Sequence, residues 1–394
     1  MVLQIATYMG IGYMVCLAAL GLINIFVNIK ITKSQLKIVL GLMIISFSLV
    51  AYSITPTTTG MDITRYFAML EEMSSMDFVT AMKTGPYANT IITNLLFFVV
   101  AKIGDYNLIK FIPTMISMLC ISYIIYNSAF KNSSDGKASL VFAFLIFVLG
   151  NCSILSIFTG VRSSMAMFIM STALFRDLYL GKRDLVTWLL YIMPIFIHTG
   201  VVLVFGIRIL SFVKFRTINY AIIFIPLVLE LFLDKFLGIN PLLDEIINKY
   251  YAYLNMKYET RWIFIFNIIR FTVLSASMAY LINNKFNNWF NNPKTTKTFL
   301  LNLILTQIGS MSINHLFLRN NTFIIVSAVP LLYLYLTNKK MTNGSWLIPG
   351  ESSLIVYNNG KSNKKRVIFA ILIAITGFSI VIQYLGFKAW ILQF

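Results

Sequence analysis

Apolar segments of about the length needed to cross a lipid bilayer recur along almost the whole chain. A transmembrane helix requires about 20 predominantly apolar residues. Runs of roughly this length are found at 5–28, 36–55, 107–129, 138–158, 163–181, 217–237, 262–283, 298–316, 319–338 and 367–390. Hydrophobic residues make up 58% of the chain and charged residues only 12%, which is more apolar surface than a soluble core can bury. The sequence therefore predicts an all-α polytopic integral membrane protein of about ten to twelve transmembrane helices.

The polar stretches between these runs are too short to fold independently. Residues 1–394 are therefore predicted to form a single transmembrane domain. The first run has neither a basic leading segment nor a small-residue cleavage site, which favours a retained helix over a removed signal peptide. Within the domain, we predict an outer loop at 56–106 with interfacial or re-entrant helices, a second outer loop at 238–261 and a cytoplasmic loop at 339–366.

The formal net charge of +18 comes from lysines and arginines that gather between the apolar runs. In a membrane protein such residues remain on the cytoplasmic side, so the excess predicts topology and gives no reason to expect a nucleic-acid partner. The basic residues assigned to the cytoplasm are Lys30, Lys33, Lys37, Lys131, Lys137, Arg176, Lys182, Arg183, Arg208, Lys214, Arg216, Lys285, Lys294, Lys297, Lys339, Lys340, Lys361, Lys364, Lys365 and Arg366. Residues 56–87 carry more acids than bases and residues 238–261 are balanced, so both segments are assigned to the outer face.

Two apolar runs cannot be simple membrane crossings in this topology. Run 88–104 lies between the first outer loop and the next crossing, so we expect an interfacial or re-entrant helix there. Run 185–207 begins and ends on the cytoplasmic side but is too short for two crossings, which predicts two half-helices broken around Pro194 and Gly200. Broken backbone at membrane depth is tolerated only where it is buried in protein or lines a wet cavity. His198 lies at this break.

Ionisable residues inside or beside membrane helices are costly, and they are candidates for function. Outside the basic clusters, the candidates are Asp62, Arg65, Arg162, His198, Arg261, His315 and Arg319. The predicted topology directs nearly all of them to one cavity that opens on the outer face. Structural roles remain as alternatives: arginines anchored at lipid headgroups, histidines that stabilise helix packing or a helix end, and a surface ion pair between Asp62 and Arg65.

The sequence contains no P-loop, GxGxxG unit, HExxH or GxSxG motif of a soluble enzyme. The three cysteines have unrelated spacing, which suggests neither a disulfide framework nor a metal site. A metal site made of His198, His315 and Asp62 has no supporting spacing either. We therefore expect neither a metal nor another cofactor.

The segment Thr159–Gly200, TGVRSSMAMFIMSTALFRDLYLGKRDLVTWLLYIMPIFIHTG, combines three features in a fixed order. An arginine opens a span rich in small residues, a short basic turn follows, and the next span ends in a His-Thr pair. This order resembles the Wzy/EpsG-like bacterial polysaccharide polymerases. The residues that carry the resemblance are Arg162, the turn Leu180–Asp184, and His198 with Thr199.

Two further segments resemble the same family. MDITRYFAMLEEM (Met61–Met73) is similar to the family's Asp-plus-Tyr stretch after the second span, here Asp62 and Tyr66. NHLFLRNNTFIIVSAVPLLYLYL is similar to its late arginine followed by a span that ends in proline, here Arg319 and Pro330. One departure concerns TGPYANT (84–90), where the family often has a glutamate and this chain has no acid. The resemblance therefore supports no catalytic carboxylate at that place.

The resemblance implies a GT-C-like multi-pass glycosyltransferase in the bacterial cytoplasmic membrane, with an active site that faces outward. Such an enzyme transfers a glycan from an undecaprenyl diphosphate carrier to the sugar hydroxyl of another lipid-linked repeat unit, without a metal. The lipid-linked oligosaccharide is thus both donor and acceptor. Membrane lipid surrounds the enzyme, and the implied partner proteins are a chain-length regulator and a flippase.

Residue chemistry suggests a role for each candidate in this reaction. Arginine is always charged and its planar fork matches phosphate oxygens, so Arg162 and Arg319 are predicted to neutralise the departing diphosphate. His198 is predicted to be the general base for the acceptor hydroxyl, with Asp62 as the alternative. The predicted substrate-binding residues are Arg65, Tyr66, Arg261 and His315.

Two other functions remain open at this point. A lipid-linked glycan ligase would use the same chemistry on a different acceptor. A flippase or other transporter of the lipid-linked oligosaccharide would also place polar residues at broken helices, usually in two related halves. Only one broken run is recognised in the sequence, which favours the polymerase.

Overall fold

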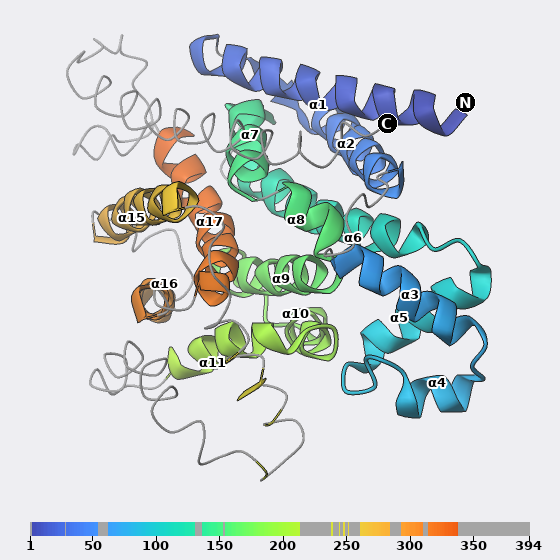
Figure 1. Ribbon diagram of the computed structural model, residues 1–394. Helices are drawn as coiled ribbons and strands as arrows, with labels where there is room; N and C mark the ends of the chain where they lie inside the picture. The colour runs from blue at the N-terminus through green and yellow to red at the C-terminus, as the bar shows by residue number, and fades with distance from the viewer. Residues whose placement is uncertain are drawn as a thin grey trace, which may run out of the picture.

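The computed structural model describes residues 2–27, 29–53, 62–130, 136–152, 154–212, 261–283, 293–309 and 314–337, together with 238, 244, 247, 248 and 251 (Figure 1). The predicted crossings at 217–237 and 367–390 and the predicted cytoplasmic loop at 339–366 lie outside the described residues. Most of the predicted outer loop at 238–261 lies outside them as well.

The described part of the chain is almost entirely helical, as the apolar runs predict. The helices that coincide with predicted crossings are α1 (Val2–Phe26), α2 (Lys33–Ser53), α6 (Leu108–Phe130), α15 (Arg261–Asn283), α16 (Pro293–Gly309) and α17 (Asn314–Thr337). Within the described residues, α2 and α6 are long and apolar enough to cross a membrane. The helical class is thus confirmed for the part of the chain that the structure describes.

The prediction of one continuous crossing at 138–158 is wrong. The run forms two helices, α7 (Val141–Asn151) and α8 (Ile154–Thr159). At Cys152 the backbone is extended, with a ψ angle of 118°, and an extended residue ends the hydrogen-bond ladder of a helix. Apolar character predicts that a segment is buried, but it does not predict that its backbone is continuous.

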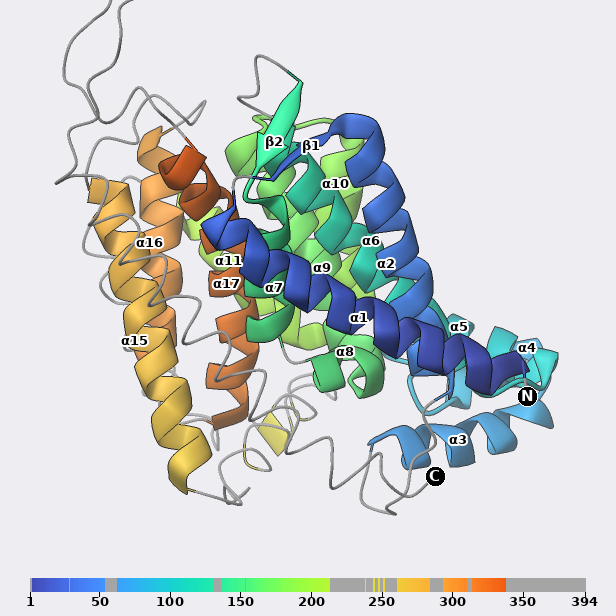
Figure 2. The same ribbon diagram turned by 90° about the horizontal axis from the view of Figure 1, so that it is seen from above.

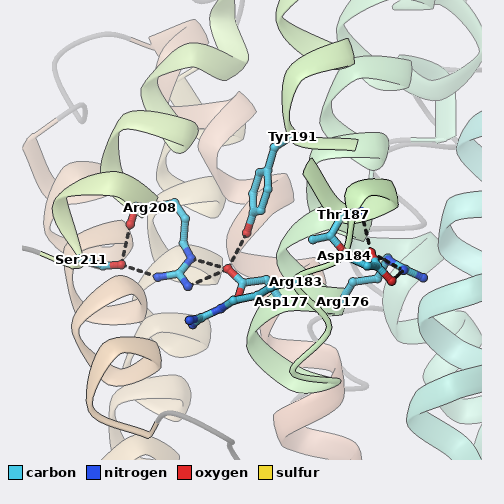
Figure 3. Close-up of polar contacts among 8 residues, drawn as sticks. All are labelled: Arg176, Asp177, Arg183, Asp184, Thr187, Tyr191, Arg208 and Ser211. Atoms are coloured by element: carbon cyan, nitrogen blue, oxygen red, sulfur yellow. Dashed lines mark hydrogen bonds and ion pairs between the residues drawn. The ribbon is translucent and has the colours of Figure 1, made fainter. Parts of the chain in front are cut away.

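The next run contains a second irregularity. Helix α9 (Val161–Leu174) continues into a π-helical turn at Phe175–Tyr179. A π turn inserts an extra residue into the helix and is frequent at functional sites. Arg176 and Asp177 lie in this turn and bind different partners (Figure 3).

A short antiparallel sheet is the non-helical element among the described residues. Strand β1 (Lys30–Thr32) pairs with β2 (Lys137–Ser139), with Ile31 opposite Ala138. Both strands belong to basic segments that are predicted to share the cytoplasmic side. Their pairing places the two segments at one end of the molecule, whereas α3 (Asp62–Ser74) lies at the opposite end (Figure 2).

The main apolar core lies between α2, α6, α7, α9 and α17. Aromatic side chains that are almost fully buried fill this core, among them Phe47, Phe144, Phe168 and Phe323. Helix α1 lies across α2 and α7 (Figure 2). Helix α17 also contacts α15 and α16, so the three late helices close one side of the bundle (Figure 1).

A second, smaller apolar cluster joins α3 to α4 (Phe78–Thr84) and α5 (Ile91–Ile103). The buried residues of α3 recur every three or four positions and therefore share one helix face. They are Ile63, Tyr66, Leu70 and Met73. Helix α5 has 13 residues and is about 20 Å long, too short for a hydrocarbon core of about 30 Å. This length is compatible with the predicted interfacial or re-entrant helix at 88–104, whose position relative to the membrane remains a prediction.

The 185–207 run forms two short helices separated by 3-10 turns, as predicted. Helix α10 (Leu185–Ile192) leads through turns at Met193–Phe196 and Thr199–Val201 into α11 (Val202–Leu210). The break thus includes both Pro194 and Gly200, and His198 lies between the two turns.

The two ends of this broken hairpin meet at one carboxylate. Arg183, just before α10, contacts Asp177 at 2.8 Å, and Arg208, near the end of α11, contacts it at 2.6 Å (Figure 3). Tyr191 of α10 donates a third contact to Asp177 at 3.1 Å. The hairpin therefore enters and leaves at the same end of the bundle.

Candidate functional site

Arg162 and Tyr87 form the centre of the candidate site. Arg162 lies in the first turn of α9, and Tyr87 lies in the turn between α4 and α5. The guanidinium carbon of Arg162 lies 3.6 Å from the centre of the Tyr87 ring, a cation–π contact at close range. The rings of Tyr66 and Phe97 surround Tyr87 edge-on, at 6.2 and 5.1 Å between ring centres.

Two buried polar atoms of this pair have no hydrogen-bond partner among the described residues. They are Nε of Arg162 and the hydroxyl oxygen of Tyr87. A buried donor without a partner costs free energy, and such groups are rare in folded proteins. The cation–π contact uses the face of the ring and does not satisfy either atom. The pair is therefore suited to donate to an acceptor that enters from outside the protein.

The charges beside this pair come from α3. Arg65 binds Asp62 at 2.8 Å, and both side chains are more than half exposed, so the ion pair itself contributes little stability. The Arg65 guanidinium lies 5.9 Å from the centre of the buried Tyr66 ring. Tyr66 thus anchors the charged face of α3 against Tyr87, and Asp62 and Arg65 form the exposed rim of the site.

Burial raises the pKa of the Tyr87 hydroxyl to about 12, although the positive charge of Arg162 acts in the opposite direction. The hydroxyl therefore remains protonated at neutral pH and can donate a hydrogen bond. Together, Arg162, Arg65 and Tyr87 offer positive charge and donors to an anion, while Asp62 offers a carboxylate at the rim.

His198 occupies the break of the hairpin in a defined orientation. Its backbone N–H donates to the Pro194 carbonyl at 2.8 Å, and its Nδ1 accepts from the Gly200 N–H at 2.9 Å. Since Nδ1 uses its lone pair as an acceptor, the neutral ring carries its proton on Nε2. In this state Nε2 is the donor atom of the ring, and action as a base through Nδ1 would require release of the Gly200 N–H.

Helix α5 connects the His198 break to the Tyr87 turn. Thr93 donates its hydroxyl to the carbonyl of Ile197, next to His198, at 2.8 Å. One residue further, the Asn94 amide donates to the Ala81 carbonyl at 2.7 Å and accepts from the Tyr87 N–H at 3.4 Å. The predicted outer helix and the predicted broken hairpin are therefore in direct contact, as a shared site requires.

Gly85 is the residue that allows the Tyr87 turn to approach α5. A Cβ atom at this position would overlap the Ala81 carbonyl oxygen and the Asn94 side chain. We expect Gly85→Ala to cost about 1–3 kcal/mol of stability through overpacking, measured as a lower Tm in detergent. Gly12→Ala is the matched control, because a Cβ there meets no atom within 4 Å. Equal Tm values for the two variants would contradict this account.

The structure brings together only part of the predicted site. Asp62, Arg65, Tyr66 and Arg162 lie in one cluster, and His198 is linked to that cluster through α5. Arg261 begins α15, and His315 and Arg319 lie in the first two turns of α17. Their side chains are outside what the structure describes, so their convergence on Arg162 remains a prediction.

Three polar residues were not among the candidate functional residues chosen from the sequence. Tyr87 lies in TGPYANT, where no local signal indicates that an aromatic ring would meet Arg162. Arg270 is 7% exposed in α15 and donates to the Asn151 carbonyl at 3.2 Å. Lys110 is 2% exposed in the first turn of α6, with its Nζ 5.5 Å from the centre of the Phe67 ring. Both cations interrupt apolar runs, so the rule for intramembrane charges could have found them.

Among the described residues, no group of three or more His, Cys, Asp or Glu side chains is arranged to hold a metal ion. Comparisons with protein-family models, curated proteins and solved structures found no match to this chain.

Proposed function

We propose that the protein is a multi-pass glycosyltransferase of the bacterial cytoplasmic membrane that polymerises lipid-linked glycan repeat units at the outer face. The observation that carries the proposal is the close contact of Arg162 with the Tyr87 ring, in which Nε of Arg162 and the Tyr87 hydroxyl have no hydrogen-bond partner among the described residues. The resemblance of Thr159–Gly200 to Wzy/EpsG-like polymerases supplies the reaction, and the broken hairpin supplies the kind of cavity wall that a lipid-linked substrate needs.

The positions of the charges support an outward-facing site. Arg162 and Asp177 lie near opposite ends of the α9 segment, about 20 Å apart at 1.5 Å per residue. The paired basic segments of β1 and β2 lie away from α3, at the other end of the bundle (Figure 2). Lysines and arginines favour the cytoplasmic side, so the Arg162 end would face outward.

In the proposed reaction, the bond between the donor sugar's anomeric carbon and the diphosphate oxygen breaks. The oxygen of an acceptor sugar hydroxyl forms the new bond to that carbon. Negative charge then develops on the diphosphate, where Arg162 and the Tyr87 hydroxyl would donate to it and stabilise the transition state. Arg319 is proposed as a second arginine for the same diphosphate.

The hydroxyl proton of the acceptor requires a base. Because Nδ1 of His198 already accepts from the Gly200 N–H in the described geometry, we assign the base to Asp62 and propose that His198 donates to the diphosphate through Nε2. The products are a lengthened lipid-linked glycan and undecaprenyl diphosphate.

Two substitutions that replace the His198 ring with an amide side chain, Asn or Gln, test the role of this residue. Asn at this position can still accept from Gly200 but has no group at the place of Nε2, whereas Gln can present an amide near Nε2. If Nε2–H is the required group, His198→Asn should lose about 100- to 1000-fold, and His198→Gln should retain more activity than His198→Asn. The measurement is the initial rate of polymerisation with equal folded protein. A variant rate within twofold of the parent would exclude His198 from the chemistry.

The function itself is tested with purified protein in detergent. The assay supplies the lipid-linked repeat unit from the producing cell, adds chelator, and reads products on a gel. A ladder of lengthened glycans supports the polymerase, whereas transfer of one glycan to a different acceptor supports a ligase. Movement of the lipid-linked sugar across liposomes without a ladder would identify a transporter and overturn the proposal.

A further inference from the structure

An apolar groove is lined by residues other than those of the candidate site. Helices α2, α6, α9 and α10 line it, and its volume is about 590 Å³, within the range of known ligand pockets. Its apolar lining includes Leu40, Gly41, Ile44, Leu119, Val186 and Leu190. A Cβ placed on Gly41 would meet no atom within 4 Å, so the floor of the groove is open at that position.

The groove carries positive charge at the end that bears the strands. Its described lining includes two basic side chains, Lys37 and Arg176, and no acidic one. The Nζ atom of Lys37 lies 5.8 Å from the ring centre of Tyr126. One helical turn earlier, the Nζ atom of Lys33 lies 5.7 Å from the ring centre of Phe130. The two lysines are therefore held on the side of α2 that faces α6.

Arg176 is fixed in place by several neighbours. It contacts Asp184 at 2.6 Å and donates to Thr187 at 3.0 Å (Figure 3). It also donates to the Tyr123 hydroxyl at 3.0 Å. Asp184 offsets the charge of Arg176. Lys33 and Lys37 form no salt bridge with an acidic side chain among the described residues, so they provide the net positive charge at the rim of the groove. The result is an apolar groove with a cationic rim.

We propose that this groove binds an anionic phospholipid from the cytoplasmic leaflet, with one acyl chain along Leu40, Ile44 and Leu119 and the phosphate at Lys33 and Lys37. Apolar length combined with positive charge at one end complements a lipid with an anionic headgroup. Each basic residue near a membrane surface favours anionic lipid. The site is separate from the glycan chemistry and does not depend on it.

The test measures retained lipid by native mass spectrometry of the full-length protein. The probes are dioleoyl phosphatidylglycerol and dioleoyl phosphatidylcholine, which share acyl chains and differ in charge. We expect one phosphatidylglycerol to be retained with a preference of about 30-fold, from two lysines. Lys33→Gln with Lys37→Gln should abolish the preference. Lys294→Gln with Lys297→Gln, an equal loss of charge from the exposed start of α16, should preserve it.

A second variant tests the groove without changing charge. Gly41→Leu should fill the floor and reduce the retention of both lipids at least tenfold, whereas Gly12→Leu, which also enters open space, should not. Soluble glycerol 3-phosphate should fail to displace the lipid. Equal retention of the two lipids, full retention in Gly41→Leu, or displacement by glycerol 3-phosphate would each overturn the proposal.

Discussion

Arg162→Ala is expected to lower the polymerisation rate by about 100- to 1000-fold, the typical loss when one donor to a developing negative charge is removed. Arg162 lies against the Tyr87 ring in the candidate site, and its buried Nε atom has no hydrogen-bond partner among the described residues. The alanine variant removes the charge and the donor together. The measurement is the initial rate in the ladder assay, at equal amounts of monodisperse protein.

Further variants separate the contribution of the Arg162 charge from the contributions of the hydrogen-bond donors of Arg162 and Tyr87. Arg162→Lys keeps the charge but loses the planar fork, so it should recover little of the rate. Tyr87→Phe keeps the stacked ring and removes only the hydroxyl, so its loss measures the Tyr87 donor. Lys83→Ala removes an exposed charge from the neighbouring helix α4 and should leave the rate within twofold. If Arg162→Ala resembled Lys83→Ala, the diphosphate-binding role of Arg162 would be wrong.

Asp177→Asn is expected to have the largest effect on stability, a loss of about 3–5 kcal/mol. Asp177 and Arg208 form a salt bridge of 2.6 Å with side-chain exposures of 5% and 2%. Removal of one partner leaves the other charge buried without compensation, which costs more than the pair contributed. Since the same carboxylate also binds Arg183 and Tyr191, both ends of the broken hairpin should loosen. The measurement is thermal unfolding in detergent.

The chain provides a matched control for this prediction. Asp184 makes a similar contact with Arg176, but its side chain is 48% exposed. In Asp184→Asn the new side chain can still accept from the Thr187 N–H and cap α10, so only a small change in Tm is expected. The double variant Asp177→Asn with Arg208→Met should recover part of the lost stability. Equal Tm shifts for Asp177→Asn and Asp184→Asn would contradict the importance of the buried pair.

The helices and the hairpin break could be predicted from the sequence because they depend on neighbouring residues. The length of an apolar run predicts helices such as α2 and α6. The charge balance of the flanking loops predicts that 88–104 and 185–207 are not simple crossings. Pro194 lacks a backbone N–H and therefore marks the place where the second of these runs breaks. Each of these inferences uses local length, charge or backbone chemistry.

The contacts within the candidate site required the tertiary structure. Tyr87 and Arg162 lie on segments far apart in the chain, and no periodicity indicates that a ring in TGPYANT covers that guanidinium. The tautomer inferred for His198 depends on the Gly200 N–H, which reaches Nδ1 only through the fold of the break. The interruption at Cys152 was likewise hidden within an apolar run.

Local sequence features thus predicted helices such as α2 and α6, the break of the hairpin, and the ionisable residues that stand out. The contact of Arg162 with Tyr87, and the contacts of Asp177 with both ends of the hairpin, depend on tertiary packing. Apolar patterns indicate how much of a helix is buried. They do not report which neighbour covers it, because that depends on the packing of several helices at once.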